Sequence, residues 1–188
     1  MVHTKMENEY YYTIFSGCGK TRWLADERAK KQFLDQLLKL QGRGGFRIYA
    51  FCLLDAETHF LLEIPEDGDF ERTVAGIAKK LKESVQLYEP DAKREPSVWK
   101  KKISPCSHSD ILEYCCRIHL LAARYAERIQ DYWWSSYVDY RHRNITGLVA
   151  TEAVLHILDS EPRRALQKFV QYHEKYALLI EDEQKRRT

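Results

Sequence analysis

The sequence lacks any long apolar run. Across its 188 residues no apolar stretch approaches the roughly 20 residues that a helix needs to cross a bilayer. The opening segment, MVHTKMENEYYY, carries acids and tyrosines where a signal peptide would have an apolar stretch. We therefore expect a cytoplasmic protein with no membrane partner.

Cysteines are few, odd in number and poorly spaced for metal binding. The five thiols show no CxxC or zinc-finger spacing, and two of them are adjacent, so they point to different faces of any helix. In a cytosolic protein this pattern indicates reduced and mostly buried thiols. These residues are Cys18, Cys52, Cys106, Cys115 and Cys116.

Internal repeats, low-complexity segments and a strong charge imbalance are also missing. The formal net charge is +2, which by itself neither favours nor opposes a nucleic-acid partner. What is there is the composition of a globular protein, with 44% apolar and 31% charged residues. The length fits one folded domain.

Hydrophobic periodicity predicts the element order β-α-β-β-α-β-α followed by a helical tail. This order is typical of an α+β fold of the ferredoxin-like kind, with an antiparallel sheet and helices on one face. We expect an α+β domain over residues 1–145 and a C-terminal helical extension over 146–188. The expected strands are 9–16, 46–54, 58–64 and 97–105, and the expected helices are 25–41, 69–88, 107–129, 151–159 and 161–187.

Three segments resemble one protein family in the same order. They are YYYTIFSGCGK (10–20), AFCLLDAETHFLLE (50–63) and RIHLLAARYAERIQDYWWSSYVDY (117–140), in which WSSY (134–137) is the most specific match. From about residue 9 to 175 the chain resembles the REP-associated tyrosine transposases, relatives of the single-tyrosine HUH transposases. The resemblance implies an HUH-transposase-like fold that acts on single-stranded or hairpin DNA.

The resemblance also implies a metal site at the start of the expected strand 58–64. Two histidines of the family, at positions i and i+2, hold a divalent ion that polarises the scissile phosphate. The matching positions here are Glu57 and His59, so the first histidine is a glutamate, and Asp55 and Ala56 replace a preceding Pro-Asn. A carboxylate suits Mg²⁺ or Mn²⁺. The alternative is a strand histidine with a hydrogen-bonded ring beside a turn carboxylate.

The family nucleophile is a helix tyrosine, and its position falls on Arg117. A guanidinium stays protonated and cannot replace it. Tyr114 lies one helical turn earlier on much the same face and is the candidate nucleophile, while Tyr125, two turns later, is a poorer one. The alternative is that Tyr114 packs on an apolar helix.

Two basic segments are candidate DNA contacts, because one of them surrounds an aromatic side chain that could stack on a base. The alternative is a solvated loop and helix end. The predicted contacts are Lys79, Lys80, Lys82, Trp99, Lys100, Lys101, Lys102 and Arg117. Four further aromatic residues, Trp133, Trp134, Tyr137 and Tyr140, are expected to pin the tail helices to the body, and His119 is expected to pack between helices.

Three functions remain open at this point. The chain could be an enzyme that nicks and rejoins single-stranded DNA, or a domesticated relative that binds DNA without cleaving it. From another class, it could be a protein-interaction scaffold on the same fold. A monomer and a homodimer are both compatible with the sequence.

Overall fold

A four-stranded antiparallel sheet forms the centre of the protein. The computed structural model describes residues 8–17, 22–90, 95–103 and 108–185. The strands follow the order β2-β3-β1-β4, and each neighbouring pair is antiparallel. This confirms the expected ferredoxin-like α+β fold. The strands are β1 (Glu9–Ser16), β2 (Arg47–Leu53), β3 (Glu57–Ile64) and β4 (Ser97–Ile103).

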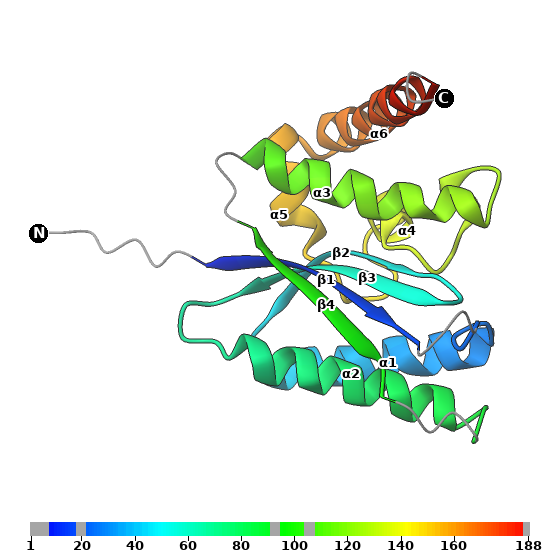
Figure 1. Ribbon diagram of the computed structural model, residues 1–188. Helices are drawn as coiled ribbons and strands as arrows, with labels where there is room; N and C mark the ends of the chain where they lie inside the picture. Colours follow the sequence, from blue (N-terminus) through cyan, green and yellow to red (C-terminus); the bar gives the residue numbers. More distant parts are fainter. Residues whose placement is uncertain (1–7, 18–21, 91–94, 104–107, 186–188) are drawn as a thin grey trace, which may run out of the picture.

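Helices cover both faces of this sheet (Figure 1). We expected helices on one face only. Helices α1 and α2 share one face of the sheet, but α3 and the C-terminal helices lie across the opposite face. The helices are α1 (Glu27–Gly44), α2 (Phe70–Gln86), α3 (His108–Leu120), α4 (Tyr137–Arg141), α5 (Thr151–Leu158) and α6 (Pro162–Lys185), with short 3₁₀ turns η1 (Leu121–Arg124) and η2 (Ile129–Asp131).

The face under α1 and α2 is closed by apolar packing. Phe15, Phe33 and Phe60 are fully buried, and the Phe60 ring contacts both others edge-on. Helix α1 begins where Asp26 accepts a hydrogen bond from the Arg28 amide at 2.8 Å. It ends at Gly45, whose φ of 66° is the left-handed conformation that glycine adopts without strain.

Helix α3 is shorter than the sequence predicts. We expected a helix to residue 129, but the α-helical bonding stops at Leu120 and tightens into the 3₁₀ turn η1. The turn closes with the Tyr125 amide donating to the Ala122 carbonyl at 2.9 Å. As a result Arg124 comes to lie beside the start of β3, where it contacts Glu57.

The WSSY segment pairs with the outer edge of β2. The Leu53 amide donates to the Trp134 carbonyl at 2.8 Å, and the Ser136 amide donates to the Phe51 carbonyl at 2.9 Å. The Ser136 hydroxyl also accepts from the Phe51 amide at 2.8 Å. Because these bonds use the backbone groups of an edge strand, the segment closes this side of the sheet.

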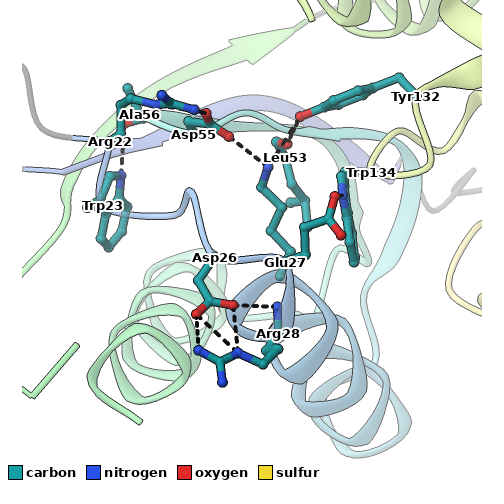
Figure 2. Close-up of polar contacts among 11 residues, drawn as sticks. Arg22, Trp23, Asp26, Glu27, Arg28, Leu53, Asp55, Ala56, Tyr132 and Trp134 are labelled. Atoms are coloured by element: carbon teal, nitrogen blue, oxygen red, sulfur yellow. Dashed lines mark hydrogen bonds and ion pairs between the residues drawn. The ribbon is translucent and has the colours of Figure 1, made fainter. Parts of the chain in front are cut away.

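Two of the four aromatic residues in this connection pin the tail, as predicted. Tyr137 and Tyr140 are buried and stack on Phe169 of α6. The prediction is wrong for Trp133, which is 60% exposed, and for Trp134, whose indole donates to Glu27 of α1 (Figure 2).

His119 packs between helices, as expected. One ring nitrogen of His119 lies 2.9 Å from His173 of α6, and the other lies 2.8 Å from the Ser136 hydroxyl. Both histidines are buried. They therefore connect α3, the WSSY segment and α6.

The structure also answers the expectations on thiols and membrane spans in part. Cys52, Cys115 and Cys116 are free and buried, as expected, whereas Cys18 and Cys106 lie outside the described residues. Among the helices of the described ranges, none is both long and apolar enough to span a bilayer.

Candidate nucleic-acid interface

The turn between β2 and β3 is anchored by a buried carboxylate. Asp55 is 4% exposed and accepts hydrogen bonds from Lys30 at 2.8 Å and from Arg22 at 3.0 Å (Figure 2). Burial alone would raise the pKa of Asp55, but these two cations outweigh it and the pKa is lowered. The turn that leads into Glu57 is thereby fixed by two ion pairs.

Antiparallel pairing decides which side chains share the face of the sheet under α3. Residues directly opposite one another in a ladder point to the same side. Ile14 lies opposite both His59 and Trp99, and Tyr12 lies opposite Lys101. We call this side of the sheet the site face, defined by Tyr12, Ile14, Glu57, His59, Trp99 and Lys101.

Tyr12, His59 and Glu57 form a row of short contacts across the site face. The Tyr12 hydroxyl lies 2.6 Å from Nδ1 of His59, which is a hydrogen bond. Nε2 of His59 lies 3.0 Å from Oε1 of Glu57, but it is buried and makes no hydrogen bond of acceptable geometry. The ring of His59 is thus fixed by Tyr12 and borders the Glu57 carboxylate.

Burial controls the ionisation of His59 and Tyr12. Burial lowers the pKa of His59 below 6.5, although the Glu57 carboxylate opposes the shift, so the ring is neutral at pH 7. Burial also raises the pKa of Tyr12 to about 12. The two aromatic side chains are therefore uncharged, and the charges of the site belong to Glu57 and the neighbouring arginines.

Arg124 supplies a cation that contacts Glu57 directly. Its Nη1 donates to Oε1 of Glu57 at 3.2 Å, the oxygen that also faces His59. The Arg124 side chain is 60% exposed and the Glu57 side chain is 32% exposed. The predicted metal ligands, Glu57 and His59, therefore lie side by side, but the Glu57 carboxylate is already paired with the Arg124 guanidinium.

The arrangement fits a divalent ion poorly. The buried Nε2 of His59 could coordinate an ion, because it lacks a hydrogen bond. However, Oε1 of Glu57 is shared with Arg124, and among the described residues no group of three or more His, Cys, Asp and Glu side chains could hold an ion. The Glu57 carboxylate and the His59 ring therefore suit a bound guanidinium better than Mg²⁺ or Mn²⁺, which need more oxygen ligands.

Tyr114, the predicted nucleophile, lies over the same face. Its ring centroid is 5.9 Å from that of Tyr12, and the side chain is half-buried. Arg117, one of the predicted DNA contacts, is 59% exposed, and its Nε donates to Glu113 at 3.0 Å and to the Tyr176 hydroxyl at 2.7 Å. The structure thus places both beside the site face, and it leaves the catalytic role of Tyr114 a prediction.

The edge strand β4 adds an aromatic and a cation. Trp99 packs edge-on against Tyr12, with centroids 5.6 Å apart, yet it remains 50% exposed. Lys101 is exposed and forms no ion pair with any residue in the described ranges. An exposed indole beside a cation without a counter-charge can engage a base and a phosphate.

The remaining predicted DNA contacts lie elsewhere. Lys100 and Lys102 point to the opposite face of β4, where Lys100 pairs with Glu71 and Lys102 pairs with Glu9. Helix α2, which carries the other predicted lysines, is also on that side of the sheet (Figure 1). Each of these has an acidic neighbour, since Lys79 and Lys80 lie near Glu83 and Lys82 pairs with Glu95.

Sequence reasoning missed Tyr12 and Arg124. The strand alternation of YYYT could have placed Tyr12 on the face of His59 once β1 and β3 were paired. Arg124 follows Arg117 by seven residues, which is two helical turns and much the same face. Its contact with Glu57 depends on the turn η1, and no sequence signal indicated that turn.

Comparison with known proteins supports the fold. No protein-family model and no curated protein matches the sequence. A solved REP-associated tyrosine transposase bound to a REP hairpin is similar in structure, with a TM-score of 0.59 and 18% sequence identity over 80% of this chain and 87% of that chain. A "putative transposase" from Deinococcus radiodurans R1 gives a TM-score of 0.46 and 17% identity over 61% of this chain and 93% of that chain.

The fold defines the class. The chain is an α+β protein with the fold of the REP-associated tyrosine transposase, and the resemblance seen in the sequence is confirmed at that level.

Proposed function

We propose that the protein binds single-stranded or hairpin-bearing DNA on its site face. The observation that carries this proposal is the grouping of an exposed indole, Trp99, with three exposed cations around the contact of Tyr12 and His59. The cations are Lys101, Arg117 and Arg124, which come from β4, α3 and η1.

The chemistry of this surface suits an unpaired strand. Lysine and arginine attract the phosphate backbone, and an aromatic ring stacks on bases that a duplex would hide. Arg117 and Arg124 are partly engaged by carboxylates, which holds their guanidinium groups in place. Held cations lose less conformational freedom on binding than mobile ones.

The solved protein of the same fold supports a hairpin as the ligand. That protein was bound to a REP hairpin. In the present chain β4 is an edge strand, because its other neighbour in the order β2-β3-β1-β4 is absent from the described sheet. The exposed side of Trp99 is therefore reachable by a strand that runs along this edge.

The test is fluorescence anisotropy with a labelled DNA hairpin that carries a single-stranded flank. A blunt duplex of equal length serves as the competitor. We expect the flanked hairpin to bind more tightly than the duplex and the affinity to fall steeply as salt rises. Trp99→Ala and Lys101→Gln should weaken binding, while Lys79→Gln on the far side serves as the matched control.

Two results would contradict the proposal. One is an affinity that is insensitive to salt or absent altogether, which would favour the protein-interaction scaffold. The other is a loss of binding in Lys79→Gln with none in the site-face variants, which would move the DNA to α2.

Strand nicking through Tyr114 is a second candidate activity. It is favoured by the position of Tyr114 over Tyr12 and His59, and it would join a DNA phosphate to the tyrosine oxygen while releasing a hydroxyl end. The assay is a denaturing gel for a covalent protein–DNA adduct in Mn²⁺ and in EDTA. An adduct lost in Tyr114→Phe would establish the enzyme.

The same gel distinguishes other outcomes. An adduct that survives in Tyr114→Phe but is lost in Tyr12→Phe would move the nucleophile to β1, where His59 contacts the hydroxyl. Retention of DNA without any adduct would leave binding as the function.

A further inference from the structure

We propose that the guanidinium of Arg124 takes the place of a divalent ion beside Glu57 and His59, and that it binds a DNA phosphate there. The inference rests on the proposed function, since the ligand is a phosphodiester of the bound strand. It makes the phosphate site independent of metal.

The first argument is the place that Arg124 occupies. It contacts the carboxylate oxygen of Glu57 that also faces Nε2 of His59, so it lies on the donor pair that would hold an ion. Charge is balanced within the pair of Arg124 and Glu57. A divalent ion would have to displace the guanidinium from this oxygen.

The second argument is what Arg124 has left to offer. A guanidinium carries five N–H donors in a planar fork. Contact with Glu57 uses one nitrogen, and the other donors bind no residue within the described part of the chain. The side chain is 60% exposed, so the remaining edge of the fork can take two phosphate oxygens side by side.

The third argument is electrostatic. The positive charge of Arg124 acts on the neighbouring groups, because it lowers the pKa of His59 and opposes the rise in the pKa of Tyr12. Arg117 acts on Tyr12 in the same direction. Glu57 acts on both groups in the opposite direction, and its effect is the larger one, so it balances the charge of Arg124 at this point. A phosphate held by Arg124 would therefore lie beside neutral Tyr12 and His59, with Arg117 as the additional positive charge near Tyr12.

The experiment combines an ion readout without DNA and a DNA readout without ion. Electron paramagnetic resonance follows free Mn²⁺ as protein is added, and anisotropy follows binding of the flanked hairpin in EDTA and in Mn²⁺. The variants are Arg124→Gln, which removes the charge, and Arg124→Lys, which keeps the charge but not the fork. Arg128→Gln is the matched control, because Arg128 is an exposed arginine of the same connection that pairs with Asp131.

We expect the Mn²⁺ signal to stay unchanged with wild-type protein and hairpin affinity to be equal in EDTA and Mn²⁺. Arg124→Gln should weaken binding by about tenfold and lower the salt slope by about 1, with partial rescue in Arg124→Lys and none of this in Arg128→Gln. Thermal melts of each variant confirm folding.

The inference fails if wild-type protein removes the Mn²⁺ signal and Glu57→Gln and His59→Ala both restore it. It also fails if the hairpin binds and Arg124→Gln matches the wild type. If the wild type binds no DNA at all, the proposed function itself is overturned, which is a separate and recognisable result.

Discussion

The two faces of the sheet differ most clearly in three consecutive lysines of β4. Lys100 and Lys102 point toward α2 and the N-terminal end of β1, and each is paired with a glutamate. Lys101 points to the site face and has no ion pair within the described ranges. The same residue type, at neighbouring positions, is therefore neutralised on one face and left available on the other.

This difference extends beyond the lysines. On the α1–α2 face, apolar side chains such as Phe15 and Phe60 are fully buried in the core. On the site face, α3 covers β2 and β3, while Ile14, Tyr12 and Trp99 remain partly or half exposed. One face thus contributes stability and the other presents a surface, so mutations on the two faces should affect different measurements.

The largest expected effect is on stability. Phe60→Ala removes a fully buried ring between Phe15 and Phe33 and should lower the free energy of unfolding by about 3–5 kcal/mol. The matching variant on the site face is Ile14→Ala. It should lower the free energy of unfolding by about 1 kcal/mol or less, because Ile14 is partly exposed. Urea unfolding at pH 7 measures both, and equal losses would remove the distinction between the faces.

The second effect is a loss of stability in mild acid. Burial lowers the pKa of His173 to about 4 and that of His119 well below 6.5, and His59 is shifted in the same direction. A folded-state pKa below the unfolded value means that the stabilisation is complete above about pH 6.5 and is lost as pH falls. Each buried histidine should cost about 1.4 kcal/mol per pH unit between pH 6.5 and its folded pKa.

The check is urea unfolding at pH 7, 6 and 5, where the paired carboxylates stay ionised. His173→Gln should flatten the dependence on pH, because the amide keeps a hydrogen-bonding side chain but does not titrate. A slope that His173→Gln leaves unchanged would assign the acid sensitivity to other groups.

Much of the fold could be predicted because local signals agreed with the tertiary structure. The β-favouring residues of 9–16 and the hydrophobic periodicity of 25–41 and 69–88 predicted elements whose observed bounds differ by a few residues from the expected ones. The end of α3 could not be predicted, since residues 121–129 favour a helix and the contacts of η1 decide otherwise.

The site was predictable only in part for the same reason. His59, Glu57 and Trp99 could be placed from motif and strand alternation, but the face of each lysine required the register of β4 against β1. A run such as KKK carries no register of its own. The partners that neutralise Lys100 and Lys102 are distant in sequence, so a cluster of charges could not be divided into paired and available members.

The third effect is on DNA affinity. Trp99→Ala should weaken binding of the flanked hairpin by about 1–3 kcal/mol, because it removes the exposed ring on which a base can stack. Trp133→Ala is the matched control, since Trp133 is 60% exposed and stacks on His142 instead. Anisotropy titrations at one salt concentration compare the two, and equal losses would mean that the indole of Trp99 has no special place.

The smallest effect sharpens the comparison most. Lys101→Gln should reduce hairpin affinity by about 1 kcal/mol or less and lower the salt slope by about 1, as expected for one phosphate contact. Lys100→Gln and Lys102→Gln remove the same charge from adjacent positions, so a long-range effect of net charge would appear in all three. Because those two lysines are already paired with Glu71 and Glu9, their contact with DNA should be missing and their salt slopes should match the wild type. Slopes reduced equally in the three variants would show that DNA senses the charge of β4 as a whole, and the division between the faces would then have no role in binding.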